Sequence, residues 1–309
     1  MIVSTIEDLP PIHKPVVTIG IFDGVHLGHR YILNKLKENA RAVGGESVVL
    51  TLWPHPRLVL DKYLGTFRLL HTKEEKIGAL EACGIDHLVL IPFNEELASM
   101  STCDFVRSFL VDRLSIEALV LGHDNRFGSE GQDDEGLQHC AAGQHFRLLR
   151  LPEFKPAGQH ISSTVIRGLL LEGELEEANR LLGFSFSLRG EIVEGNRIGR
   201  QIGYPTANVH PEGYKLIPMN GVYAIEAELK GRTYGGMLNI GFRPTLDSPI
   251  DVKTIEAHLF GMSGDLYGEE VELRFLARMR KEMKFSSLDE LSAQLARDER
   301  LARQILKME

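Results

Sequence analysis

Two histidines stand three residues apart in a glycine-rich stretch near the start of the chain. His26 and His29 belong to residues 20–29, Gly-Ile-Phe-Asp-Gly-Val-His-Leu-Gly-His. A short apolar run precedes this stretch and a segment with helical spacing follows it, so we predict a turn from a buried strand into a helix. The unpaired N–H groups and positive dipole end of a helix N-terminus suit a phosphate group, and imidazole N–H groups would add donors.

Two alternatives to a phosphate site remain for these histidines. By spacing alone, a phosphate site and an ordinary turn with two exposed histidines are equally supported. A metal site is the weakest of the three, because no third ligand stands at a suitable spacing from His26 and His29.

A second group suited to phosphate begins at residue 162. Ser162, Ser163 and Thr164 stand at the predicted start of a helix, where they offer hydroxyls and N–H groups. Arg167 follows with a guanidinium fork that matches phosphate oxygens. Taken alone, this segment is better explained as an ordinary helix N-cap than as a phosphate site.

A third group lies in the second half of the chain. A glycine-rich run over residues 190–204 is neither a Walker loop nor a Rossmann turn. Thr206 and Asn208 alternate in the extended segment that follows, so their side chains share one face, and their oxygens suit Mg²⁺. Glu256 stands in a strand-like segment. Considered alone, it is best interpreted as a strand residue that faces solvent.

The elements that must position the first two groups follow an alternating pattern. Apolar strand-like runs alternate with segments of helical spacing, which predicts βαβ units and a parallel sheet. Ligands in such sheets bind at the carboxyl ends of the strands. We expect strands at 16–22, 47–53, 87–91 and 117–121, helices at 29–43, 73–83 and 102–114, and helical structure from 162 to 183.

Beyond residue 184 the pattern changes to short strands between Gly, Pro and Asn clusters, which is typical of an antiparallel barrel. Ser287 and Glu290 form a capping box that opens a terminal helix to about Leu306. The fold class is therefore α/β with a parallel sheet in domain 1–184, followed by an antiparallel β-barrel with a terminal α-helix in domain 185–309. Barrel strands are expected at 188–193, 222–229, 233–240, 254–259 and 271–280.

Composition limits the classes of function. The formal net charge is −8 and no Lys/Arg-rich stripe is present, which disfavours nucleic-acid binding. No apolar run approaches the roughly 18 residues of a membrane span, and residues 1–15 lack the pattern of a signal peptide, so we expect a cytoplasmic protein without a membrane partner. Cys83, Cys103 and Cys140 are an odd number without paired spacing, so we expect reduced thiols.

Taken together, three segments of the first half resemble a known family. Residues 20–29 closely resemble the nucleotidylyltransferase motif as found in bacterial bifunctional riboflavin kinase/FAD synthetases. Residues 121–128 look like that family's segment after a later strand, and residues 161–167 look like its Ser-Ser-Thr-x-x-Arg phosphate clamp. The resemblance implies a Rossmann-like nucleotidylyltransferase domain that transfers the adenylyl group of ATP to FMN, forming FAD and pyrophosphate.

The second half resembles the riboflavin kinase part of the same family. The Pro-Thr-Ala-Asn sequence at 205–208, with its preceding glycines, carries the likeness, and further segments follow in the family's order to the C-terminus. The resemblance spans roughly residues 16–306. It implies that ATP phosphorylates riboflavin to FMN, with Mg²⁺ on the nucleotide, and that FMN and FAD are substrate and product rather than prosthetic groups.

The resemblance also assigns roles to the candidate residues. His26, His29 and Arg167 would be catalytic in adenylyl transfer, and Glu256 would accept the proton of the ribityl 5′-hydroxyl. The metal ligands would be Thr206 and Asn208. The nucleotide-binding set would be Gly20, Phe22, Asp23, Gly24, Gly28, Ser162, Ser163, Thr164, Gly195, Gly199 and Gly203. The flavin-binding set would be Trp53, His55, Asp124, Asn125, Arg126 and Arg280.

Some alternatives remain beside this interpretation. Asn125 stands where the family usually has an aromatic residue. This difference affects the contact made at that position and not the reaction itself. For the turn that carries Trp53 and His55, a purely structural role as a rigid turn is as well supported as contact with the flavin. The chain could retain only one of the two activities, or bind flavin as a non-catalytic sensor. The expected partners are riboflavin, FMN, FAD and ATP, and the sequence does not determine the oligomeric state.

Overall fold

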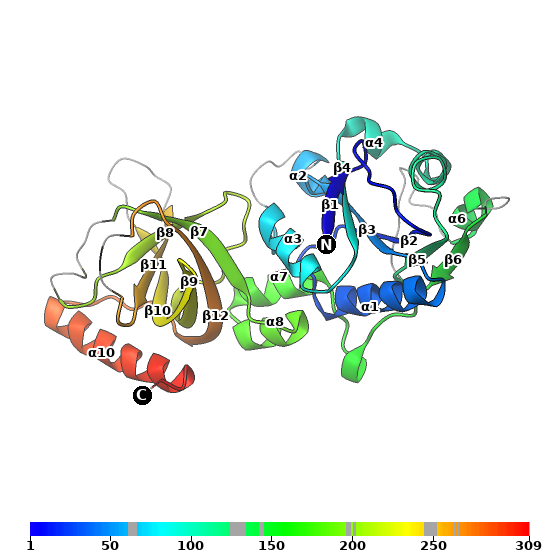
Figure 1. The fold of residues 1–309 in the computed structure, drawn as a ribbon. Helices are drawn as coiled ribbons and strands as arrows, with labels where there is room; N and C mark the ends of the chain where they lie inside the picture. Colours follow the sequence, from blue (N-terminus) through cyan, green and yellow to red (C-terminus); the bar gives the residue numbers. More distant parts are fainter. Residues whose placement is uncertain are drawn as a thin grey trace. The chain divides into compact units, whose positions relative to one another are not determined.

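The computed structural model describes residues 1–60, 67–123, 134–141, 145–195, 199, 202–243, 252–262, 264 and 266–308. These residues form two compact units, Met1–Ser163 and Thr164–Glu309 (Figure 1). The first unit mixes helices with a sheet, and the second is built on a barrel. The domain boundary expected after residue 184 stays a prediction.

A six-stranded sheet forms the centre of the first unit, and all of its strand pairs are parallel. Its strands lie in the order β1-β4-β3-β2-β5-β6. The chain moves from β2 to β3 on one side and later places β5 on the other side, so the strand order switches beside β2. Open parallel sheets bind ligands at such a switch, outside the carboxyl ends of the strands. The strands are β1 Ile2–Thr5, β2 Val16–Ile19, β3 Ser47–Trp53, β4 His87–Pro92, β5 Ala118–Leu121 and β6 Arg147–Arg150.

Helices cover both faces of this sheet, as the continuous apolar strands require. On β2, Val17 and Ile19 belong to the core beneath α5, α6 and the π-helix η1, whereas Val16 belongs to the core beneath α1 and α3. The alternation follows from the two-residue period of a strand. The helical elements are α1 Leu27–Ala42, α2 Pro56–Leu60, α3 Lys73–Glu81, α4 Glu95–Ser99, α5 Thr102–Phe105, η1 Val106–Val111, α6 Asp134–Ala141 and the 3₁₀ turn η2 Pro156–Gly158.

The second unit is a closed antiparallel barrel in the order β10-β11-β8-β7-β12-β9, and β9 pairs with β10 to close it. Tyr223, Phe186 and Phe275 are buried in this unit, and the Phe275 ring packs against the rings of the other two. Helix α10 packs on the outside through an apolar cluster that includes Ala302 and Phe260. The elements are α7 Ser163–Glu172, α8 Leu175–Leu182, β7 Ser187–Val193, β8 Ala207–Pro211, β9 Gly221–Leu229, β10 Arg232–Arg243, β11 Val252–Leu259, β12 Glu270–Arg280 and α10 Leu288–Ile305.

The fold class is confirmed, with local differences. Helical structure expected from 162 to 183 is two helices, because the chain turns at Gly173 with a φ of +85°, a value that favours glycine. At the start of α10, Ser287 accepts from the N–H of Glu290 as expected, but the Glu290 carboxylate accepts from the N–H of Ser286 rather than closing the box. No described helix is long and apolar enough to cross a membrane.

The expectation of three reduced cysteines is wrong for two of them. Cys103 of α5 and Cys140 of α6 form a disulfide, with Cα atoms 4.9 Å apart, while Cys83 remains a thiol. The two cysteines are 37 residues apart in the sequence. They meet because α5 and α6 cover the same face of the sheet, and spacing along the chain carries no information about that tertiary proximity.

Candidate active sites

The predicted turn at residues 20–29 joins the carboxyl end of β2 to the N-terminus of α1. His26 is the N-cap of α1, and its Nδ1 atom accepts a hydrogen bond from the backbone N–H of His29 at 3.3 Å. Because Nδ1 is the acceptor, a neutral His26 carries its proton on Nε2, where it can donate to a ligand. Helix α1 therefore begins at Leu27, two residues before the expected start.

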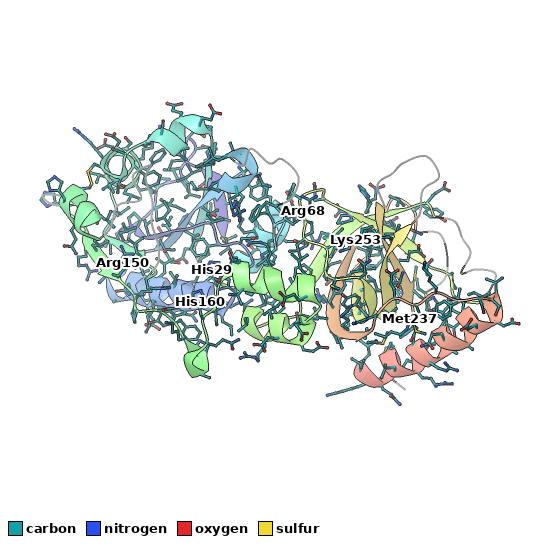
Figure 2. The ribbon with its side chains drawn as sticks, turned by 180° about the vertical axis from the view of Figure 1, so that it is seen from behind. His29, Arg68, Arg150, His160, Met237 and Lys253 are labelled. Carbon is teal, nitrogen blue, oxygen red and sulfur yellow. A yellow bond between two sulfur atoms is a disulfide. The ribbon has the colours of Figure 1, made fainter. Side chains whose placement is uncertain are left out.

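The two histidines stack on each other with ring centroids 3.7 Å apart, and Phe22 packs edge-on against His29 at 5.1 Å. Figure 2 shows His29 among the side chains of the N-terminal unit. Burial lowers the pKa of His29 well below its usual value, and the nearby His26, His71 and Lys76 lower it further. His29 is therefore neutral at pH 7. Its Nδ1 atom is buried without a hydrogen-bond partner among the described residues.

Asp23 connects this turn to two other segments of the first unit. Its buried carboxylate accepts from the backbone N–H groups of Leu70 and His71 at 3.0–3.1 Å. Its backbone carbonyl accepts from the hydroxyl of Ser163 at 2.8 Å. The structure thus brings together Asp23 and Ser163, which are 140 residues apart. Asp23 acts here as an anchor of the turn.

The backbone of the turn is held in a conformation that L-residues rarely adopt. Phe22 has a φ of 51° and Val25 a φ of 37°, which is costly for a bulky or β-branched residue and requires support from its surroundings. Gly20 leaves room for the Phe22 ring, since a Cβ atom at position 20 would lie 2.9 Å from it. Gly24 has a φ of +85°, and Gly28 lies against the His26 ring.

Lys76 is a component of this region that the sequence did not predict. It lies on α3, is only 3% exposed, and its Nζ atom donates to the backbone carbonyl of Ile21 at 3.1 Å. A lysine in a predicted helix is normally assigned to the surface. The sequence contained one indication that Lys76 is buried. Lys76 stands four residues before the apolar Leu80, side chains at this spacing share one face of a helix, and in α3 that face is buried.

The remaining predicted residues of the first group have mixed placements. Trp53 ends β3, and the Lys76 ammonium lies 4.9 Å from the centre of its ring. His55 is buried and accepts from the N–H of Arg57 at 3.0 Å. Helix α7 begins at Ser163, with Ser162 just before it and Thr164 exposed in its first turn, and half-buried Arg167 follows one turn later. Asp124, Asn125 and Arg126 lie outside the described residues.

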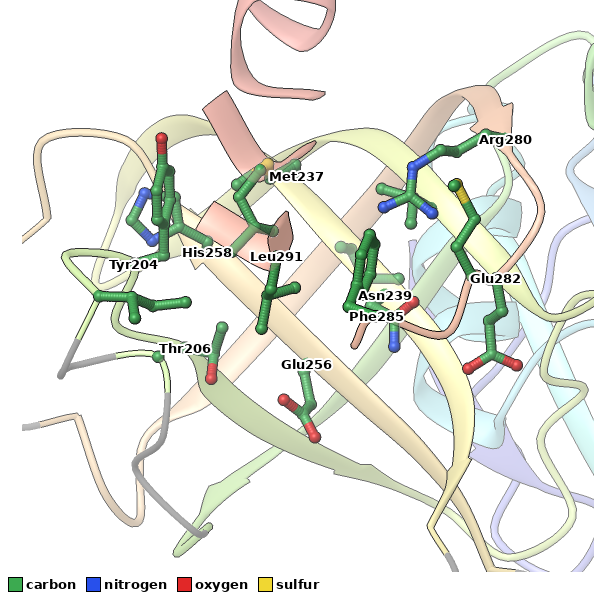
Figure 3. Close-up of a pocket in the computed structure, with 16 residues that line it drawn as sticks. Tyr204, Thr206, Met237, Asn239, Glu256, His258, Arg280, Glu282, Phe285 and Leu291 are labelled. Carbon is green, nitrogen blue, oxygen red and sulfur yellow. The ribbon is translucent and has the colours of Figure 1, made fainter. Parts of the chain in front are cut away.

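The second unit contains a pocket of about 320 Å³ between the barrel and the segments around it. Figure 3 shows Tyr204 and Thr206 at one end, Glu256 between, and Arg280 and Glu282 at the other end. Four of the predicted residues line this pocket, namely Gly199, Thr206, Glu256 and Arg280. Its apolar lining includes Met237, Met283, Phe285, Leu291 and Leu295.

Strand register places polar residues around Glu256. Glu256 on β11 is paired with Asn208 on β8 and with Asn239 on β10. Asn239 also lines the pocket, which its sequence context did not predict. A Cβ atom at Gly195 would collide with the Asn208 amide, so the glycine permits this close approach. Gly203 has a φ of +81° in the turn before β8.

Arg280 is fixed by a residue of the terminal helix. Its Nε and Nη2 atoms donate to the two carboxylate oxygens of Asp298, at 3.0 and 2.7 Å. Asp298 is 3% exposed, and Gln294 donates to the same carboxylate at 2.9 Å. Asp298 was missed because α10 has an amphipathic pattern in which an aspartate is normally placed on the solvent face.

Comparisons with known proteins extend over both units. Two family models match, FAD synthetase over residues 10–165 and riboflavin kinase over residues 182–306. The bifunctional riboflavin kinase/FMN adenylyltransferase of Listeria monocytogenes is 35% identical over 295 residues, covering 96% of this chain and 93% of that protein. The protein of the same description from Escherichia coli strain K12 is 37% identical over 291 residues, covering 94% and 92%.

Solved structures include a similar chain. A crystal structure described as a macrolide-efflux protein from Streptococcus pneumoniae matches with a TM-score of 0.88 and 31% identity, and the match covers 97% of both chains. The fold of both units is therefore shared with an experimental structure.

Proposed function

The chain belongs to the bifunctional riboflavin kinase/FMN adenylyltransferases, and from this premise we propose where its two reactions take place and which residues perform them. The riboflavin kinase activity converts riboflavin and ATP to FMN, and the FMN adenylyltransferase activity converts FMN and ATP to FAD. We assign the second reaction to the turn between β2 and α1, and the first to the pocket of the barrel.

Adenylyl transfer at the turn requires positioning and charge stabilisation rather than a protein nucleophile. An oxygen of the FMN phosphate bonds to the α-phosphorus of ATP while the bond from that phosphorus to the bridging oxygen breaks, and pyrophosphate leaves. His26 Nε2–H and the N-terminus of α1 donate to phosphate oxygens. His29 acts as a neutral imidazole, and Ser163 of the same unit adds a phosphate contact. The catalytic role that the resemblance implies for Arg167 stays a prediction.

Phosphoryl transfer in the barrel pocket begins with the ribityl 5′-hydroxyl of riboflavin. Glu256 accepts its proton as the oxygen bonds to the γ-phosphorus of ATP, and ADP leaves. The placement of Glu256 between Thr206 and Arg280 in the pocket supports this assignment. Arg280 then borders the flavin end, beside the apolar lining.

The donor atoms near Glu256 fit Mg²⁺. Thr206 offers a hydroxyl and Asn208 an amide oxygen, which are hard oxygen ligands, and Asn208 is the register partner of Glu256 on the next strand. Among the described residues no cluster of three or more His, Cys, Asp or Glu could hold a metal ion. Thr206 and Asn208 would hold a Mg²⁺ ion bound to ATP, and the ion would neutralise charge on the phosphates.

Further assignments extend the same proposal. Trp53 and His55 would contact the flavin of FMN in the first unit, as would Asp124, Asn125 and Arg126. Gly195, Gly199 and Gly203 would let the preceding loop approach the ATP phosphates. The catalytic units would correspond to residues 1–184 and 185–309, and the enzyme would act in the cytoplasm.

The arrangement of His26 at the N-cap of α1, stacked on a neutral His29, carries the adenylylation assignment. The test is a time course with riboflavin and Mg-ATP in which FMN, FAD and pyrophosphate are separated and quantified. His26→Ala should let FMN accumulate while FAD and pyrophosphate fall by roughly 100-fold or more. Unchanged FAD formation in this variant would remove the turn from the reaction.

A further inference from the structure

Lys76 is a buried cation that touches the adenylylation turn directly. Its Nζ atom donates to the Ile21 carbonyl at 3.1 Å and lies 3.4 Å from the hydroxyl of Thr51. The Thr51 hydroxyl donates to the same carbonyl at 3.2 Å. Three elements therefore meet at one backbone oxygen: α3 through Lys76, β3 through Thr51, and the segment after β2.

The Ile21 carbonyl immediately precedes the strained part of the turn. Phe22 follows it with a positive φ, and the Phe22 ring packs against His29. A change at Ile21 would therefore move the ring that supports His29. Lys76 thus acts on the histidine pair through the backbone and one aromatic ring, without needing to reach the ligand.

The charged surroundings of Lys76 are unusual for a buried ammonium. Asp23 is its acidic neighbour, but the Asp23 carboxylate already accepts from the N–H groups of Leu70 and His71. The other titratable groups of this region, His26, His29 and His71, are basic. Helix α3 with Lys76 therefore adds positive charge beneath a turn that would receive the phosphates of ATP.

We propose that Lys76 is a positioning residue for FMN adenylylation, which holds the Ile21 carbonyl and supplies buried positive charge below the phosphate-binding turn. The inference rests on the proposed assignment of adenylylation to this turn. Stability alone does not require the ammonium, because an apolar side chain of similar length in a buried position is often as stable as a charge. The Thr51 hydroxyl would still satisfy the Ile21 carbonyl.

The first experiment compares Lys76→Met with Lys76→Arg in the full chain. Lys76→Met should lower kcat/KM for FMN adenylylation by roughly 10- to 100-fold, because small misplacements of catalytic groups have effects of this size. Lys76→Arg retains the charge and should recover at least part of the loss. The riboflavin kinase activity of the same preparation serves as an internal reference, and thermal unfolding checks that Lys76→Met remains folded.

Two further variants separate the effect of charge from that of hydrogen bonding. Lys73→Met makes the same change three residues earlier on α3 and should leave both activities unchanged. Thr51→Val removes the other donor to the Ile21 carbonyl without removing charge. A much smaller effect of Thr51→Val than of Lys76→Met indicates that the charge matters, whereas equal effects would reduce Lys76 to a hydrogen-bond donor and overturn the charge part of the proposal.

The pH dependence of kcat/KM for adenylylation tests the proposal further, because it would not change with the pKa of a lysine that has only a structural role. Burial lowers the pKa of Lys76 to about 8, although Asp23 opposes this shift. Wild-type kcat/KM for adenylylation should therefore fall as the pH rises through 8. In Lys76→Arg this fall should move to much higher pH, because a guanidinium keeps its proton. A profile shared by wild type and Lys76→Arg would overturn the proposal.

Two outcomes distinguish a wrong role for Lys76 from a wrong site. If Lys76→Met keeps full adenylylation while His26→Ala abolishes it, the turn is the site and Lys76 has no part in it. If both variants keep full activity, the assignment of the reaction to the turn is itself wrong.

Discussion

At the scale of single residues, His29 links the turn proposed for adenylylation to acid stability. Its folded-state pKa lies well below the usual value of about 6.5 that applies in the unfolded chain. Below pH 6.5 the unfolded state binds a proton that the folded state does not, so the free energy of unfolding falls as the pH decreases. Thermal unfolding between pH 7.5 and pH 5 should show a smaller loss of Tm in His29→Gln than in wild type.

The control for this prediction is His145→Gln, because His145 is exposed. Its acid-induced loss of Tm should equal that of wild type. An identical loss in wild type and His29→Gln would show that the buried imidazole does not control the acid response.

Glu256 gives a second residue-scale prediction. Glu256→Gln keeps the shape of the side chain but removes the proton acceptor, so kcat for riboflavin phosphorylation should fall by roughly 10²- to 10⁴-fold. Adenylylation of added FMN should not change. Glu191→Gln, at an exposed position of β7, is the matched control and should leave kinase activity at the wild-type level. A fall of less than about threefold in Glu256→Gln would leave this carboxylate without the role of general base.

At the scale of elements, α10 supports the pocket proposed for the kinase reaction, because its Asp298 holds Arg280 of the pocket lining. Asp298→Asn removes the charge that holds Arg280, and breaking a buried pair of this kind costs about 3 kcal/mol. The KM for riboflavin should rise while the KM for FMN in adenylylation stays constant. Denaturant unfolding and steady-state kinetics measure the two effects. If KM for riboflavin does not change, Asp298 supports the helix and not the pocket.

The disulfide between α5 and α6 gives a prediction at the same scale. It closes a loop with a sequence separation of 37 residues, for which the chain-entropy model gives about 4 kcal/mol of stabilisation. Adding a reductant, or replacing Cys140 by Ser, should lower the denaturant midpoint of the first unit. Cys83→Ser should not, since Cys83 is not in the disulfide. Equal midpoints with and without reductant would show that the bridge contributes nothing.

Apolar patterning predicted the strands and helices that bury an apolar face, such as β3 and α1, because burial imposes a repeat of 3.6 residues on a helix and a short apolar run on a buried strand. It missed β1, β6 and β8, which are short and lie at a sheet edge or beside a loop. The place of the histidine pair at the start of a helix was predictable, because it depends on local spacing along the chain. Lys76, Asp298 and the disulfide were not, since each depends on which elements pack together.

At the scale of the whole molecule, we assign the two reactions to different units, and we expect FMN to pass from one to the other by diffusion. His26→Ala should still make FMN, and Glu256→Gln should still convert FMN to FAD. An equimolar mixture of these two variants, given riboflavin and ATP, should therefore produce FAD much faster than either variant alone. The measurement is FAD formed over time. No FAD from the mixture would mean that both reactions need an intact chain.

The two units also differ in how their sheets end. In the barrel every strand has a neighbour on both sides, because β9 closes the ring against β10. The sheet of the first unit is open at β1 and β6, and Ile2 and Val3 of β1 are exposed. An open strand edge with apolar side chains is a template for pairing with another chain. On partial unfolding, fibril growth and precipitation should therefore start from the β1 edge rather than from the barrel.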